Sequence, residues 1–255
     1  MMNILKVISL LMDYPKPELQ QYADALDTEI RQARQIPPEA RAQLMTLVDS
    51  VCRRDLMQVQ EEYGVLFDRG CSLSLLLFEH VHGDSRERGQ AMVDLMANYE
   101  KSGFDIAVRE LPDYIPLYLE YLAHQPDIDA RQGLADVGHI LGLLSARLHE
   151  RDSLYASLFD ALMIIGGVKV DEAKLKAEVA AEKRDDTFEA MDEVWEAEQV
   201  TFMANQSPET TCRPQTAQVQ PLRENEQAIP VTWIPENPFS NPLDDNEDTI
   251  DRVEG

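Results

Sequence analysis

The sequence predicts an all-α fold, on the strength of three observations. Only 11 of the 255 residues are glycine, and apolar residues recur at helical spacings of three and four through most of the chain. No stretch before about residue 204 alternates apolar and polar residues as a half-buried strand does. Prolines and glycines interrupt the repeats where helices would end. With a hydrophobic content of 44%, we expect one helical bundle-like domain over residues 1–204.

Four helices are expected before residue 68. The first ends before Pro15, the second covers about residues 17–36, the third begins at Pro38 and the fourth follows Asp55. Pro38 suits a first helical turn, where its missing N–H costs nothing. The residues expected to face the core are Ile4, Val7, Ile8, Leu11, Leu19, Tyr22, Leu26, Ile30, Leu44, Leu47, Val48, Val51, Leu56, Val59, Tyr63, Leu66 and Phe67.

Further helices are expected between residues 86 and 204. Asp84 and Glu87 have the spacing of a capping box before one helix, which Gly103 ends. Asp113 is the expected N-cap of the next, with Pro116 at its third position. One long helix over residues 134–148, one over 155–165 and a polar one over 171–183 follow. The last is expected to start at a capping box of Asp186 and Glu189 and to bury Phe188, Met191, Trp195 and Phe202.

The chain changes character after Asn205. Residues 205–255 hold half of the 14 prolines, ten acids, three arginines and no lysine. Such a segment cannot bury enough apolar surface to offset the entropy of ordering it. We therefore predict a disordered, acidic, proline-rich C-terminal tail that includes one apolar island, residues 229–235.

The charge balance limits the kinds of partner. A formal net charge of −24 argues against binding nucleic acid and against docking to anionic membranes. Cys52, Cys71 and Cys212 are too few and too irregularly spaced for a disulfide framework, which favours a reducing, cytoplasmic location. We find neither a signal peptide nor an apolar run long enough to span a bilayer.

One motif raises the alternative of a metal-dependent hydrolase. His80, His82 and Asp84 form H-x-H-x-D, which resembles the first metal-binding motif of metallo-β-lactamase-like enzymes. That motif belongs to a β-sandwich, and on a helix the two imidazoles would lie about 200° apart. Nucleophile-elbow and dinucleotide-binding motifs are absent from the sequence. We therefore predict no catalytic residue, metal or cofactor, and a generic helical scaffold is a third possibility.

Polar residues in two stretches suggest a partner-binding surface instead. Acids and tyrosines over residues 110–121 suit an acidic, aromatic groove for a basic amphipathic helix, although an ordinary capped helix explains them equally well. Three arginines within residues 69–88 can clamp an anion or simply pair with neighbouring acids. The candidate binding residues are Asp68, Arg69, Glu79, His80, His82, Arg86, Arg88, Glu110, Pro112, Asp113, Tyr118 and Glu120.

Several of these stretches together resemble the NarJ-type chaperones of respiratory nitrate reductase, within the wider TorD/DmsD-like group. The resemblance covers about residues 3–204. It rests on residues 63–70 (YGVLFDRG), 75–83 (LLLFEHVHG), 85–92 (SRERGQAM), 110–113 (ELPD), 117–122 (LYLEYL), 185–187 (DDT) and 195–200 (WEAEQV).

The resemblance implies an all-helical, cytoplasmic chaperone of the TorD/DmsD-like type that is not itself a catalyst. Its implied partner is the apo catalytic subunit of respiratory nitrate reductase, including the N-terminal peptide of that subunit. It would keep this partner competent for insertion of the molybdenum cofactor and iron–sulfur cluster, and away from the membrane anchor until then. Proteins of molybdenum cofactor biosynthesis are a further implied class of partner.

Overall fold

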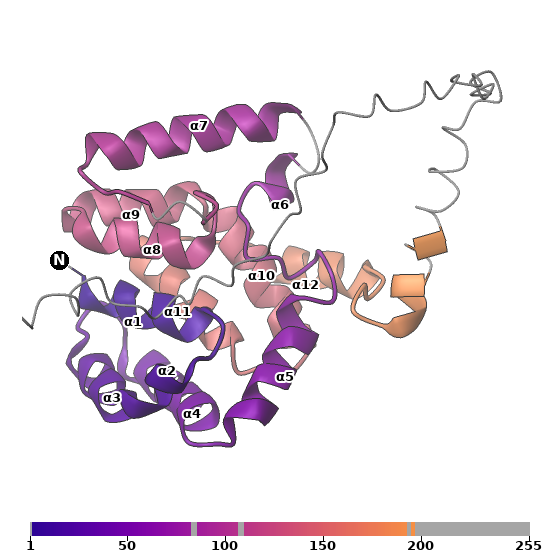
Figure 1. Ribbon diagram of the computed structural model, residues 1–255, viewed down its shortest axis with the longest axis horizontal. Helices are drawn as coiled ribbons and strands as arrows, with labels where there is room; N and C mark the ends of the chain where they lie inside the picture. The colour runs from indigo at the N-terminus through magenta and orange to yellow at the C-terminus, as the bar shows by residue number, and fades with distance from the viewer. Residues whose placement is uncertain (1, 83–85, 107–109, 193–194, 197–255) are drawn as a thin grey trace, which may run out of the picture. The chain divides into compact units, whose positions relative to one another are not determined.

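The computed structural model describes residues 2–82, 86–106, 110–192 and 195–196 (Figure 1). Its helices are α1 (Asn3–Met12), α2 (Pro17–Gln21), α3 (Ala23–Gln32), α4 (Pro38–Cys52), α5 (Leu56–Phe67), α6 (Glu79–His82), α7 (Arg86–Lys101), α8 (Ile115–His124), α9 (Asp127–Asp136), α10 (Gly138–Glu150), α11 (Ala156–Gly166) and α12 (Glu172–Ala181). Residues 188–192 and 195–196 are also helical. The described residues form no strand, so the all-α prediction is confirmed.

The hydrophobic core surrounds α1. Its buried stripe of Ile4, Leu5, Ile8 and Leu11 is almost wholly inaccessible to solvent, and the helix packs against α8, α3 and α11. Most of the residues predicted to face the core are buried, as expected from their helical spacing. Within the described residues, no helix combines the length and apolar character that crossing a bilayer requires.

Two predicted helices are each broken in two. The chain turns at Tyr22 between α2 and α3, and this residue is 62% exposed rather than buried. It also turns at Val137 between α9 and α10, where Gly138 lets the first turn of α10 approach Val168. A Cβ at Gly138 would lie within 2.8 Å of the Val168 methyl groups. The apolar periodicity continues across both breaks, so it does not reveal them.

Helix ends elsewhere follow the predicted signals more closely. The Asp55 and Asp171 carboxylates accept hydrogen bonds from the N–H groups of Gln58 and Lys174, as N-caps do. Gly167 ends α11 in the left-handed conformation, at φ 65°, which glycine adopts without strain. The predicted capping box of Asp84 lies outside the described residues.

The prediction that Asp113 is the N-cap of α8 is wrong. Tyr114 occupies the N-cap position of α8, and Pro116 is the second residue of that helix rather than the third. Asp113 lies one residue earlier and is fully buried. Its backbone carbonyl instead accepts a hydrogen bond from Leu77, which is distant in sequence.

An isolated antiparallel bridge joins residues 75–77 to residues 113–115. The Leu77 N–H donates to the Asp113 carbonyl at 2.9 Å, and the Ile115 N–H donates to the Leu75 carbonyl at 2.8 Å. The Asp113 carboxylate also accepts a hydrogen bond from the Phe78 N–H at 3.2 Å. This pairing connects the chain before α6 to the start of α8, and helical periodicity does not predict it.

Asp113 is a buried carboxylate at the centre of this bridge. Its nearest cation is Arg88, whose Nη2 lies 4.0 Å from Asp113 Oδ2. The other oxygen, Oδ1, has no hydrogen-bond partner among the described residues. Burial raises the pKa of Asp113, and the Phe78 N–H and the Arg88 charge partly oppose this effect.

A second long-range contact is made by residues 182–187, which we call the strap. The Asp185 carboxylate accepts hydrogen bonds from the Ser72 N–H at 2.7 Å and the Ser72 hydroxyl at 2.6 Å. It also lies directly against Gly70, where a Cβ would come within 2.7 Å of the carboxyl atoms. Gly70 is therefore required for this close approach.

Arginines from α10 complete the attachment of the strap. Arg147 donates two hydrogen bonds of 2.8 Å to Glu182 and a third, of 2.7 Å, to the Ser72 carbonyl. Arg151 lies 3.4 Å from Asp185 and 3.6 Å from Asp186. Arg184 and Arg151 together lower the pKa of Asp186 to about 2, with the Arg184 hydrogen bond contributing most. These ion pairs hold the strap against the end of α10.

The helix after the strap differs from its prediction in two respects. Thr187, rather than Asp186, caps it, since the Thr187 hydroxyl accepts a hydrogen bond from the Ala190 N–H. Phe188 and Trp195 are 67% and 64% exposed, although we predicted both to be buried. Phe188 instead lies beneath the Arg69 guanidinium, 5.0 Å from the ring centroid. Phe202 and the predicted tail, including the boundary at residue 204, lie outside the described residues.

We predict that Gly70→Ala destabilises the chain by roughly 1–3 kcal/mol, because the added methyl displaces Asp185 from Ser72. Urea unfolding measures the loss. The matched control is Gly89→Ala in α7, where no atom lies within 4 Å of the added Cβ. Because alanine favours a helix more than glycine does, this control should raise the free energy of unfolding by about 0.5–1 kcal/mol. In a chain that also carries Asp185→Ala, the Gly70→Ala substitution should lower the free energy of unfolding clearly less than it does in the wild type. Equal costs in both backgrounds would contradict the assigned contact.

We predict a pH-dependent stability difference between Asp113→Asn and the wild type. Because the pKa of Asp113 is raised on folding, the folded wild type retains a proton that the unfolded chain releases above about pH 4. Wild-type stability therefore falls as the pH rises through the raised pKa, whereas the asparagine variant lacks this titration. Urea unfolding at several pH values between about 4 and 7 should show the variant gaining relative to the wild type. A constant difference would contradict this account.

Candidate partner-binding site

Four of the predicted site residues come together, but mostly inside the protein. Arg88 on α7 forms an ion pair with Glu79 on α6, with 3.3 Å between Nη2 and Oε1. Arg88 also faces Asp113, and the carbonyl of the adjacent Pro112 accepts a hydrogen bond from the Tyr99 hydroxyl at 2.7 Å. Pro112 and Asp113 are buried, and neither lines the groove between α7, α8 and α9.

Tyr118 does line a groove, between α7, α8 and α9, with a volume of about 380 Å³. We call it the α7–α9 groove. Its lining residues are Leu95, Asn98 and Lys101 of α7 with the following Ser102, Tyr118, Tyr121 and Leu122 of α8 with the following Gln125, and Asp129, Gln132, Gly133 and Asp136 of α9. Their side chains combine aromatic rings with acids and amides, but of the predicted site residues only Tyr118 is among them.

The floor of the groove is held by close packing between α8 and α9. The Tyr118 hydroxyl donates a hydrogen bond of 3.0 Å to the Gly133 carbonyl. A Cβ at Gly133 would lie within 2.9 Å of Leu122 and of that hydroxyl, so glycine is needed here. Burial raises the pKa of Tyr118, which therefore stays protonated as a hydrogen-bond donor. The floor is thus fixed before any ligand arrives.

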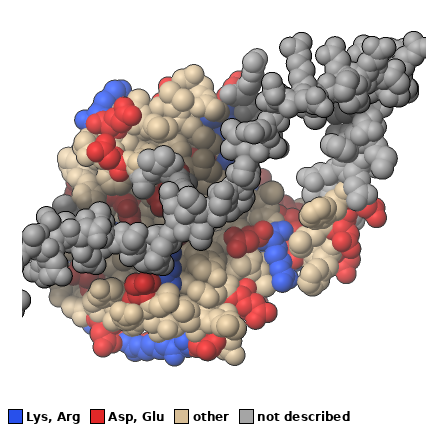
Figure 2. Space-filling view, viewed as in Figure 1, with Lys and Arg blue, Asp and Glu red and all other residues tan. Residues whose placement is uncertain are grey.

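The rim of the groove is acidic. Asp129 and Asp136 are exposed on α9, one turn to either side of Gln132, which donates a hydrogen bond to Asp136 at 2.8 Å. Lys101 is the only cation among the lining residues. Elsewhere, acidic side chains are spread over the visible face of the molecule, while basic ones occupy a few separate places (Figure 2). The local field favours a cationic ligand.

Glu110 and Glu120 lie on a different side of α8. Glu120 is within electrostatic range of Lys6 on α1 and of Asp13 just after it, and neither glutamate lines the α7–α9 groove. Burial, followed by the nearby Glu110 charge, raises the pKa of Glu120. Neither carboxylate has an ion-pair partner within 4 Å among the described residues. The prediction that these glutamates and Tyr118 share one groove is therefore not met by the geometry.

Three further predicted residues lie apart from the groove. Asp68 is exposed at the end of α5, and Arg69 stacks on Phe188. His80 is partly buried, and its Nε2–H donates to the Ser74 carbonyl at 2.8 Å. Burial lowers the pKa of His80 and so favours the neutral imidazole. The side chains of His82 and Arg86 fall outside the described part of the structure.

The metal-site alternative gains no support from these positions. His80 directs Nε2 to a backbone carbonyl, which leaves only Nδ1 to bind a metal. Asp84, its predicted partner, is outside the described residues. Within the part of the chain that is described, no group of three or more His, Cys, Asp or Glu side chains has an arrangement that could hold a metal ion.

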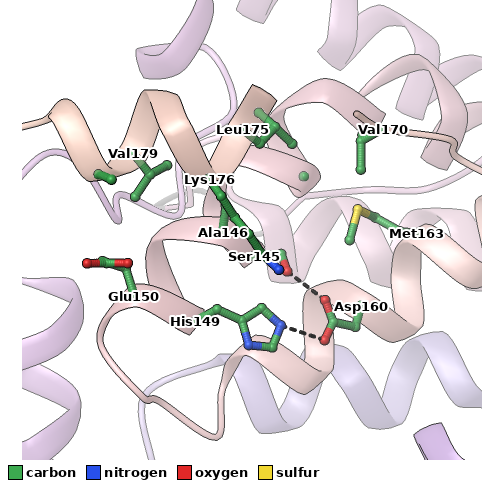
Figure 3. Close-up of a pocket in the computed structure, with 12 residues that line it drawn as sticks. Ser145, Ala146, His149, Glu150, Asp160, Met163, Val170, Leu175, Lys176 and Val179 are labelled. Carbon is green, nitrogen blue, oxygen red and sulfur yellow. Dashed lines mark hydrogen bonds and ion pairs between the residues drawn. The ribbon is translucent and has the colours of Figure 1, made fainter. Parts of the chain in front are cut away.

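A larger cavity of about 600 Å³ lies between α10, α11 and α12 (Figure 3). Asp160 accepts a hydrogen bond from the Ser145 hydroxyl at 2.6 Å and one from His149 at 2.9 Å. The carboxylate therefore separates the serine from the imidazole. A nucleophilic triad needs the imidazole next to the serine, so this cluster is not arranged for serine activation.

Sequence reasoning missed the acidic rim on α9. The signal was present, because Asp129, Gln132 and Asp136 are spaced three and four residues apart and therefore share one helix face. Apolar spacing predicts only the buried face of a helix, so it does not predict this exposed polar stripe. Together with Tyr118 and Tyr121 it lines the α7–α9 groove.

Comparison with known proteins agrees with this all-helical architecture. Residues 33–161 match the family model for the nitrate reductase delta subunit. The chain is 47% identical to an Escherichia coli protein named nitrate reductase molybdenum cofactor assembly chaperone NarJ, over 79% of this chain and 85% of that protein. It is 46% identical to the E. coli protein named probable nitrate reductase molybdenum cofactor assembly chaperone NarW, over 83% of this chain and 87% of NarW.

A more distant relative occurs in Bacillus subtilis, named as a probable chaperone of the same kind. It is 36% identical over 40% of this chain and 56% of its own length. The family match covers half of the chain, and the E. coli relatives are aligned over most of it. The chain therefore belongs to the nitrate reductase delta subunit family.

Proposed function

We propose that this protein is an assembly chaperone for respiratory nitrate reductase. It binds the apo catalytic subunit, including its N-terminal peptide, in the cytoplasm. It keeps that subunit competent for insertion of the molybdenum cofactor and iron–sulfur cluster until membrane assembly. The names and extensive identity of the E. coli relatives support the maturation role. The resemblance noted in the sequence supports the choice of partner.

The α7–α9 groove is the proposed binding site for the N-terminal peptide. The observation that carries this assignment is the pairing of an aromatic floor, Tyr118 and Tyr121, with an acidic rim, Asp129 and Asp136. A basic amphipathic helix would place its apolar residues on the rings and its Lys or Arg residues against the rim. Exposed charges add little affinity, so the peptide can later be released.

The same features favour a binding role over a catalytic one. The polar cluster in the cavity between α10, α11 and α12 has the wrong order for a nucleophilic triad, and His80 is engaged with the backbone. The acidic composition gives no basis for binding nucleic acid or an anionic membrane. We therefore propose that the partners are proteins. The first is the apo catalytic subunit, and proteins of molybdenum cofactor biosynthesis are a second class.

We predict that Asp129→Lys combined with Asp136→Lys weakens binding of the N-terminal peptide about tenfold. The reason is that reversing two rim charges replaces attraction with repulsion, worth roughly 1–2 kcal/mol at low salt. Isothermal titration calorimetry with the full-length chaperone measures the affinity. Added salt should reduce the difference, since both positions are exposed.

The matched control is Glu110→Lys combined with Glu120→Lys, which changes the net charge equally on another side of α8. This control should reduce affinity much less. Should the glutamate variant lose binding while the aspartate variant keeps it, the peptide lies on the side predicted from sequence alone. Asp113→Lys is unsuitable as a test, because a buried lysine would disrupt the bridge between residues 75–77 and 113–115.

We predict that removing residues 205–255 leaves peptide affinity unchanged within about twofold. The lining of the α7–α9 groove lies entirely between Leu95 and Asp136, and the tail composition is unsuited to packing a core. Calorimetry on the truncated and full-length chains makes the comparison. A truncated chain that folds normally, by circular dichroism, but no longer binds the peptide would refute this expectation.

A further inference from the structure

Helix α7 forms one wall of the groove and is firmly attached near its C-terminal end. Tyr99 is fully buried and donates its hydroxyl hydrogen to the Pro112 carbonyl at 2.7 Å. Its ring packs against Tyr121, with 4.5 Å between centroids, and against Phe104, with 5.7 Å. This cluster fixes one point on α7 relative to α8.

The middle of α7 is much less buried. Val93 and Met96 are 58% and 42% exposed, and Leu95 is only partly buried where it lines the groove. Figure 1 shows α7 extending alongside α8 and α9 as a separate outer helix. The wall can therefore tilt about Tyr99 at little cost in buried apolar surface.

The second attachment, through Arg88, is incomplete. Arg88 Nη2 is 3.3 Å from Glu79 but 4.0 Å from Asp113, which is too far for a hydrogen bond. Arg88 Nε and Asp113 Oδ1 are both buried, and neither has a hydrogen-bond partner among the described residues. Leaving buried polar atoms unpaired is unfavourable, so a small approach of α7 toward Asp113 would be stabilising.

We infer that Arg88 and Asp113 form a latch that closes when the partner peptide occupies the α7–α9 groove. Closing would bring Arg88 Nη2 within hydrogen-bond distance of Asp113 Oδ2, move the unpaired Nε and Oδ1 toward each other, and draw the Leu95 wall toward α8. Peptide binding and latch closure are therefore coupled, and each favours the other. This inference rests on the proposed function, since it assigns a moving wall to the same groove.

The dimensions of α7 make the coupling feasible. Arg88 and Tyr99 are separated by eleven residues, or about 16 Å along a helix. Shortening the Arg88–Asp113 distance by about 1 Å, to hydrogen-bond length, needs only a small tilt about Tyr99. The same tilt shifts Leu95, four residues from Tyr99, by about 0.4 Å. Glu79 competes for the Arg88 guanidinium and holds the latch partly open.

Two substitutions on the latch should have opposite effects. Arg88→Met retains an apolar stem but removes the guanidinium, so peptide affinity should fall about tenfold. Glu79→Gln removes the competing charge, so the latch should close without the peptide and affinity should rise about threefold. Titration calorimetry measures affinity. Hydrogen exchange measures protection of α7, which Glu79→Gln should raise in the free protein and the peptide should raise in the wild type.

The matched control is Arg54→Met, which removes an exposed arginine that pairs with Glu62, away from the groove. It should change neither peptide affinity nor α7 exchange. If Arg88→Met and Glu79→Gln both bind like the wild type while the Asp129 and Asp136 reversals weaken binding, the latch is wrong and the proposed function stands. If none of these variants changes affinity, the groove assignment itself is wrong. Glu79→Gln remains decisive if Arg88→Met does not fold.

Discussion

The pairing of residues 75–77 with residues 113–115 is the constraint on which the candidate site depends. These residues are nearly forty positions apart, and two backbone hydrogen bonds and the Asp113 carboxylate join them. The pairing places α6 and the start of α7 next to the start of α8. Without this pairing, α7 would be attached mainly through Tyr99. The wall that α7 contributes to the groove would then have no defined position relative to α8 and α9.

The need to pair buried backbone groups explains both long-range polar contacts, those made by Asp113 and by Asp185. The chain between α5 and α6 has no helix to satisfy its N–H and C=O groups, and buried backbone groups must be paired. Side chains therefore supply the partners. Two are distant in sequence, Asp113 for the Phe78 N–H and Asp185 for the Ser72 N–H, and one is local, His80 for the Ser74 carbonyl. An irregular segment inside a helical protein is thereby held in one conformation, and it can position helices on either side.

Local periodicity predicted most of this fold, since a helix and its buried face depend on residues close in sequence. It failed where distant contacts decide the outcome. The exposure of Phe188 and Trp195 reflects the strap, which begins that helix away from the core. Similarly, Asp113 and Glu120 look alike in sequence, yet one is buried under the bridge and the other is exposed. A spacing pattern cannot distinguish these environments.

The placement of charge in the proposed site gives a strongly acidic protein a way to bind selectively. A net charge of −24 attracts any cation weakly and without preference. Selectivity requires acids placed beside a surface that recognises shape, and Asp129 and Asp136 stand next to Tyr118 and Tyr121. Because the rim is exposed, its contribution is modest and screened by salt. A chaperone must release its partner, so an interface with fixed rings and weak charges suits that task better than a fully buried one.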